Sequence, residues 1–168
     1  WEAVQMGYSV YDNLPANFSD FLISHVAAKV AQKTEQTIWS GVNATAGEFD
    51  GFVTLMTADG DVNDVTGTTV TAANVIEEMG KVADAIPNAL YGKEDLTIYV
   101  PQNVARAYVR ALGGFGAAGL GAAGTDAKGT QWFGGEPLFF DGIRVSMVSG
   151  LASNKMVAAQ SSNLYFGT

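Results

Sequence analysis

Two short stretches decide the fold: KTEQTIWSG at residues 33–41 and GEFDGF at residues 47–52. The first closes a long run in which apolar residues recur at helical spacing, and its last residue, Gly41, is a suitable helix stop. The second is rich in glycine and leads into the apolar stretch from Val53 to Met56. Together they predict a long helix followed by a turn.

The long helix is predicted from about Ser19 to Ser40. Asn17 or Ser19 can cap its start, and Asp20 suits the positive end of the helix dipole. A helix of about 22 residues is about 33 Å long, which favours a spine over a buried core helix in so short a chain. Its apolar face carries Phe21, Leu22, Val26, Val30, Thr34 and Ile38, and its polar face carries Lys29, Gln32, Lys33 and Gln36.

Further helices and strands follow without strict βαβ alternation, which predicts an α+β fold. A second helix should start at a Thr71 cap and end at Pro87. Its buried face should hold Val75, Ile76, Met79, Val82, Ala83 and Ile86.

Later in the chain, a strand at 96–100 precedes a third helix at 104–112, which Asn103 should cap with Tyr108, Val109 and Leu112 facing inward. The glycine- and alanine-rich segment 113–135 is predicted to be a long loop. Four short strands should follow, at residues 137–140, 143–148, 156–159 and 164–166.

The composition excludes several classes of protein. The chain of 168 residues has a net charge of −8, which argues against gripping nucleic acid, and it has no Cys for disulfides or thiolate metal sites. No apolar run is long enough for a membrane span, and no signal peptide opens the chain. Because the chain begins at Trp1, we expect a processed product or part of a longer protein.

The candidate catalytic and binding motifs lack the residues or the structural context that their chemistry requires. Gly119-Leu-Gly121-Ala-Ala-Gly124 follows a predicted helix, not the strand that a dinucleotide site needs. The run at residues 59–64 lacks the glycine of a calcium loop at its sixth position. His25, the only histidine, is predicted to lie mid-helix. We therefore expect no enzymatic activity, no cofactor and no metal.

The order of several motifs resembles that of a known family. Residues 33–41 and 47–52 are similar to an "E-x-x-x-W-x-G" helix end and a "G-x-F-x-G" turn, and LTIYVPQN at 96–103 resembles a central strand. The final stretch, at 156–168, resembles "A-x-x-S-N-L-x-F-G-T". These motifs occur in this order in major capsid proteins of tailed bacteriophages with the Hong Kong 97-type fold.

The resemblance implies a domain assignment. Residues 1–46 would be part of a peripheral domain that includes the spine helix. Residues 47–168 would form an axial domain of mixed sheet plus helices, with 113–135 as an axial loop and a C-terminal return towards the peripheral domain. The family's N-terminal arm, extended loop and later peripheral strands have no counterpart in these residues.

The resemblance also implies function and partners. Many copies would form pentamers and hexamers of an icosahedral shell, built in the host cytoplasm and found in the virion. The shell would enclose double-stranded DNA without sequence-specific binding, with scaffold, portal or decoration proteins as further partners and no membrane. The expected assembly residues are Trp39, Gly119, Gly121, Gly124, Trp132 and Phe133.

Two alternatives remain open at this point. One is a shell protein of an encapsulin-like nanocompartment with the same fold. The other is a small acidic extracellular binding or adhesion domain. Electron microscopy of native material separates the three, because shells with DNA, shells without DNA and small single particles look different.

Overall fold

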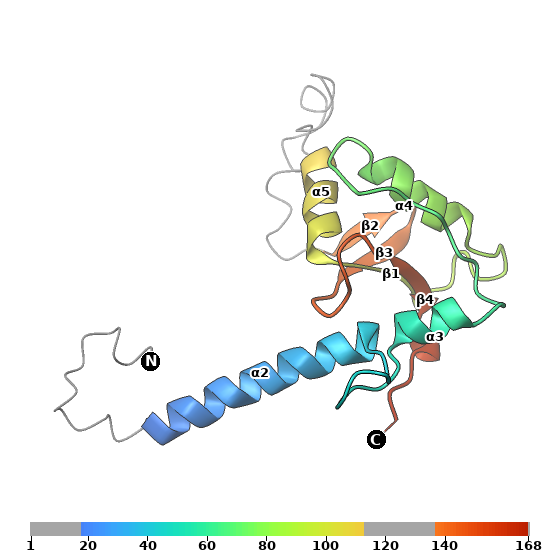
Figure 1. The fold of residues 1–168 in the computed structure, drawn as a ribbon. Coiled ribbons are helices and arrows are strands. Elements are labelled where there is room, and N and C mark those ends of the chain that lie inside the picture. Colours follow the sequence, from blue (N-terminus) through green and yellow to red (C-terminus); the bar gives the residue numbers. More distant parts are fainter. Residues whose placement is uncertain (1–17, 113–136, 168) are drawn as a thin grey trace. The chain divides into compact units, whose positions relative to one another are not determined.

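The computed structural model describes residues 18–112 and 137–167 (Figure 1). These residues form a mixed α+β structure, which confirms the predicted class. The chain divides into two compact units between Thr34 and Glu35, inside the helix Phe18–Ser40. The domain boundary expected between residues 46 and 47 stays a prediction. The elements are α2 (Phe18–Ser40), α3 (Phe52–Ala58), α4 (Val75–Asp84), β1 (Leu96–Val100), α5 (Gln102–Leu112), β2 (Leu138–Phe140), β3 (Ile143–Met147), β4 (Val157–Gln160) and a 3-10 turn (Ser161–Asn163).

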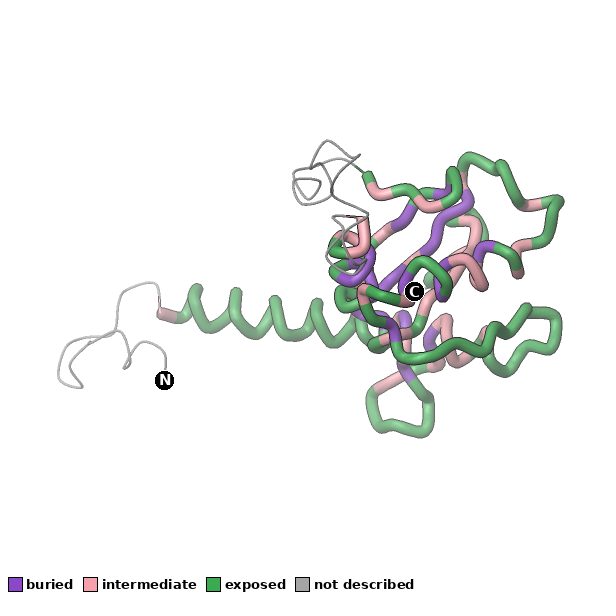
Figure 2. The backbone as a smooth tube through the Cα atoms, turned by 90° about the horizontal axis from the view of Figure 1, so that it is seen from above, coloured by how far each residue is buried: buried purple, intermediate pink, exposed green. Residues whose placement is uncertain are grey.

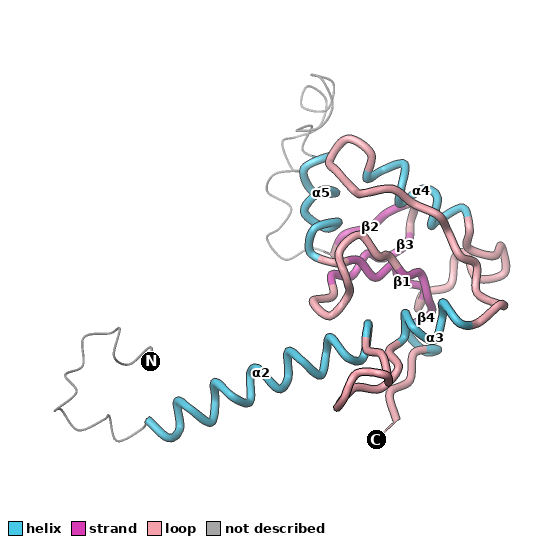
Figure 3. The backbone as a smooth tube through the Cα atoms, in the orientation of Figure 1, coloured by secondary structure: helices cyan, strands magenta, loops and turns pink. Residues whose placement is uncertain are grey.

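A four-stranded mixed sheet organises the larger unit, in the order β2-β3-β1-β4 (Figure 3). Strand β1 pairs in parallel with β3 and antiparallel with β4. Strands β2 and β3 form a hairpin whose two turn residues, Asp141 and Gly142, have φ of 52° and 78°. Positive φ at both positions is what a tight hairpin turn of matching twist requires. The predicted Asp141-Gly142 turn is thus confirmed.

The core lies where β1 meets the helices. Along β1, Leu96, Ile98 and Val100 are buried in one cluster with residues of α4 and α5, including Met79 and Tyr108. Because side chains alternate along a strand, Tyr99 faces the opposite side of the sheet. Figure 2 shows buried residues concentrated in this part of the chain. Both faces of β1 are therefore covered, and the Tyr99 face is the one that leads to the candidate site.

The caps predicted at Thr71 and Asn103 are wrong. Helix α4 begins at Val75, and Thr71 instead uses its backbone N–H and hydroxyl to donate to the Asn74 side chain. Helix α5 begins at Gln102, so Asn103 lies within its first turn and its amide bonds to Asn154. In each case a tertiary or turn contact has taken the side chain that would have capped the helix.

Three smaller predictions also need correction. Ile76 was placed on the buried face of its helix but is exposed, because the face that α4 buries is centred on Val75 and Met79. Residues 164–166 form no strand, since β4 ends at Gln160 and a 3-10 turn redirects the chain. Ser19 is no cap, because α2 already includes Phe18, and the alternative cap, Asn17, lies outside the described residues. The strands at 96–100, 137–140, 143–148 and 156–159 are confirmed within a residue or two.

Candidate assembly surface around the end of helix α2

Trp39 joins the last turn of α2 to the sheet. Its side chain is 8% exposed. The ring meets Phe52 edge to face at a centroid distance of 5.4 Å and lies 5.1 Å from the ring of Tyr99 on β1. Aromatic pairs at such distances add to the free energy gained from burial. Trp39 thus anchors the helix end beneath the 47–52 turn, within its own chain.

Close backbone packing explains the two glycines of the quoted motifs. The N–H of Gly51 donates to the carbonyl of Gly41 at 3.0 Å, and the Thr54 hydroxyl donates to the same oxygen at 2.7 Å. A side chain at Gly51 would place its Cβ 2.6 Å from the carbonyl oxygen of Thr37. Glycine is therefore required where the chain crosses back over the helix end.

A second segment closes over the same helix end. Glu35 accepts hydrogen bonds from the backbone N–H groups of Ser149 and Gly150 at 3.1 and 3.3 Å. The Ser40 hydroxyl donates to the carbonyl of Gly150 at 3.2 Å. Residues 35–41 are thus held between the 47–52 turn and the 149–151 loop. Sequence reasoning missed the loop, since nothing local links positions more than 100 residues apart.

An aromatic groove lies beside this junction, with a volume of about 430 Å³. Phe49 and Phe166 meet there at a centroid distance of 5.4 Å. The one charged residue that lines it is Asp50, whose carboxylate accepts a hydrogen bond from the backbone N–H of Asn43 at 2.9 Å. We call this surface the aromatic groove; its lining residues are Ile38, Phe49, Asp50, Phe52, Leu55, Tyr165, Phe166 and Gly167.

The first part of α2 carries a second apolar surface. Within residues 18–34 five large apolar side chains are exposed, all of them more than 40%. A row of large exposed apolar residues on one helix often marks an interaction surface. We call it the α2 apolar surface; its members are Phe21, Leu22, Ile23, Val26 and Val30.

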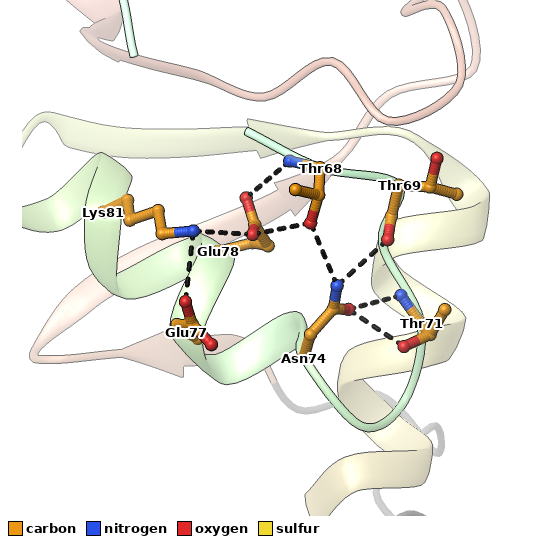
Figure 4. A network of polar contacts seen from close by, with 7 residues as sticks. All are labelled: Thr68, Thr69, Thr71, Asn74, Glu77, Glu78 and Lys81. Carbon is orange, nitrogen blue, oxygen red and sulfur yellow. Dashed lines mark hydrogen bonds and ion pairs between the residues drawn. The ribbon is translucent and has the colours of Figure 1, made fainter. Parts of the chain in front are cut away.

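A polar network fixes the start of α4 (Figure 4). Glu78 is 3% exposed and accepts hydrogen bonds from the Thr68 N–H at 3.1 Å, the Thr68 hydroxyl at 2.9 Å and the Lys81 ammonium at 2.8 Å. The hydrogen bonds from Lys81 and then Thr68 lower the pKa of the Glu78 carboxyl. Hydrogen bonds to Glu78, with Glu77 second, raise the pKa of Lys81. Every polar atom of the carboxylate has a structural partner, so the network reads as a brace for the 67–71 segment and not as a reactive centre.

The other candidate residues from the sequence are not arranged to bind a ligand or a metal in the described part of the chain. His25 stacks on Phe21 within α2 at a centroid distance of 6.2 Å. Among residues 18–112 and 137–167, no three His, Cys, Asp or Glu side chains gather as a metal site would need. In the same ranges, no helix is both long and apolar enough to cross a bilayer. Outside the described residues lie Gly119, Gly121, Gly124, Trp132 and Phe133, with the rest of the predicted axial loop.

Comparison with protein-family models, curated proteins and solved structures finds no match to this chain.

Proposed function

We propose that this chain is a shell-building subunit, a major capsid protein of a tailed bacteriophage with a Hong Kong 97-type fold. Many copies pack around ring axes as pentamers and hexamers and close an icosahedral shell around double-stranded DNA. The work is done by complementary surfaces, and no residue of the chain acts in catalysis.

The observation that carries the proposal is the junction at the end of α2. The motif pair at residues 33–41 and 47–52 suggested the family, and three of its residues have a steric or packing role in the structure. Trp39 is buried against Phe52, while Gly41 and Gly51 are in backbone contact.

The exposed apolar surfaces support the same proposal. A protein that works alone gains nothing from five large apolar side chains on one stretch of helix, and such residues favour self-association or aggregation. Copies of one chain in rings bury such surfaces against a different part of the next copy, in head-to-tail contacts. The α2 apolar surface is a suitable half of such a contact.

Charge bears on how DNA would be held. Nine basic residues face seventeen acidic ones, and the net charge is −8. DNA binding through phosphates requires clustered cations. The shell would therefore enclose DNA without gripping it through this chain, and the isolated subunit should bind free DNA weakly at any salt concentration.

Electron microscopy of the purified full chain tests the proposal. We expect closed, regular shells or rings, and native material should contain DNA-filled shells. Shells that lack DNA in native material would favour the nanocompartment, and monodisperse small particles under all assembly conditions would overturn the shell function. Replacing Gly119, Gly121 and Gly124 together with Val should leave the circular dichroism spectrum unchanged but impair shell closure, since β-branched residues restrict the backbone.

A further inference from the structure

The aromatic groove combines exposed aromatic rings with an acidic residue, and both attract cations. Three of its rings, those of Phe49, Tyr165 and Phe166, are exposed, and Tyr165 is 79% exposed. The faces of such rings carry negative electrostatic potential and attract cations. Among the described residues that line the groove, Asp50 is the one with a charged side chain. Both features favour a positively charged occupant.

Desolvation excludes a purely apolar occupant. A segment that covers the rings would also cover Asp50, and burying a carboxylate without partners for its remaining acceptor positions is costly. The Asp50 carboxylate accepts a hydrogen bond from the N–H of Asn43, and a carboxylate has about four acceptor positions. Donors from the occupant can therefore pair with it without breaking the contact to Asn43.

Geometry favours arginine over lysine. A guanidinium group is flat, can stack on an aromatic ring and can at the same time direct its N–H fork at a carboxylate. Aromatic residues and Asp50 line the same groove, and its volume of about 430 Å³ leaves room for a side chain and a short stretch of backbone. An ammonium group is a compact, strongly hydrated charge that loses more water on entering such a site.

We propose that the aromatic groove binds an arginine side chain presented by a peptide segment of a partner protein. The guanidinium lies against the rings of Phe49, Tyr165 and Phe166 and donates to the carboxylate of Asp50. This binding needs only the single chain, so it does not depend on shell assembly, and either proposal can fail while the other holds.

Ligand-observed saturation-transfer NMR on the full chain tests the binding. The probes are three blocked tripeptides, acetyl-Ala-Xaa-Ala-amide, in which Xaa is arginine, lysine or citrulline. Citrulline has the shape of arginine without its charge. We expect the arginine peptide to receive saturation at its side-chain methylenes and to bind about tenfold more tightly than the citrulline peptide.

Three variants locate the site. Asp50→Asn keeps the acceptor for Asn43 and should weaken the arginine peptide about fivefold while leaving the citrulline peptide unchanged. Phe166→Leu should weaken the arginine peptide about threefold by removing one ring face. Glu94→Gln is the matched control: it removes one exposed acid outside the groove, and we expect no change.

Several results would overturn the proposal. Equal binding of the arginine and citrulline peptides would mean that the groove does not distinguish a charged side chain from a neutral one. Equal binding of the lysine peptide would remove the assignment to arginine. A loss with Glu94→Gln as large as with Asp50→Asn would mean that the peptide senses only the general negative charge. Absence of any saturation transfer to the peptides, with the fold verified by circular dichroism, would show that the groove takes no such ligand.

Discussion

Helix α2 contains two stretches of similar composition with different surroundings. In residues 18–34 the apolar side chains, such as Leu22 and Val26, are exposed. In residues 35–40, Thr37 and Trp39 are buried, because the 47–52 turn and the 149–151 loop close over them. The difference teaches that an apolar residue on a helix marks a core only where other segments of the chain reach it. The exposed stretch is then a candidate for contacts with other molecules.

The largest effect is expected at the buried end. Trp39→Ala should lower the free energy of unfolding by about 3–5 kcal/mol, because it removes a buried aromatic side chain and its contacts with Phe52 and Tyr99. Thermal unfolding followed by circular dichroism measures the change. Val30→Ala, in the exposed stretch, is the control and should have little effect. An unchanged melting temperature for Trp39→Ala would break the comparison, because the two stretches would then behave alike.

A smaller loss is expected where the 149–151 loop closes over the helix. In Gly150→Ala the new methyl group would overlap the carbonyl oxygen of Glu35 and lie 2.9 Å from the Trp39 ring. We expect a destabilisation of about 1–3 kcal/mol in denaturant unfolding. Gly60→Ala is the matched control, because nothing lies within 4 Å of its Cβ position. Equal stability of the two variants would mean that the loop is not held tightly against the helix.

Low pH should reduce the stability contributed by Glu78 on α4, whereas the contribution of Trp39 on α2 should not depend on pH. The pKa of Glu78 is lowered in the folded chain, so its stabilising contribution is present above its ordinary value of about 4.5 and is lost as pH falls through the lower folded value. Glu78→Gln should thus lower the melting temperature at neutral pH, and its deficit should shrink below about pH 4.5. Asp95, whose pKa is lowered by hydrogen bonds from Ser162 and then Gln160, should preserve some acid sensitivity in the variant.

Melting curves between pH 3 and pH 8 measure this effect. Glu77→Gln is the control, because Glu77 is exposed and pairs with Lys81 only at the surface. Parallel curves for Glu78→Gln and the wild-type chain would show that the carboxylate does not support the fold through its charge.

The smallest effect on folding is expected in the exposed stretch. Ile23→Gln combined with Val26→Gln should change the free energy of unfolding by no more than about 0.5 kcal/mol, because both side chains are already in contact with solvent. Shell assembly, followed by light scattering and electron microscopy, should be impaired. Lys29→Gln, in the polar part of the same helix, should leave assembly intact. Normal assembly of the double variant would remove the α2 apolar surface from the proposed contacts.

Local sequence signals predicted strands and turns well where the structure depends on residues that are neighbours in the sequence. The alternation in Leu96–Val100 and the turn at Asp141 predicted strands that the structure contains. The caps at Thr71 and Asn103 were mispredicted because the Thr71 hydroxyl donates to the Asn74 side chain and the Asn103 amide donates to the Asn154 side chain. Residues 164–166 read as a strand because their pattern is apolar, yet no strand lies beside them to pair with.

By itself, the sequence determined the long helix and its stop at Gly41, since helical spacing and a glycine stop are local properties. Only the tertiary structure decided which apolar residues are buried, that Glu35 holds the 149–151 loop, and that Asp50 lines the same groove as Phe49 and Phe166. The physical reason is that burial and hydrogen bonding between distant positions depend on the path of the whole chain, which no short window of residues contains.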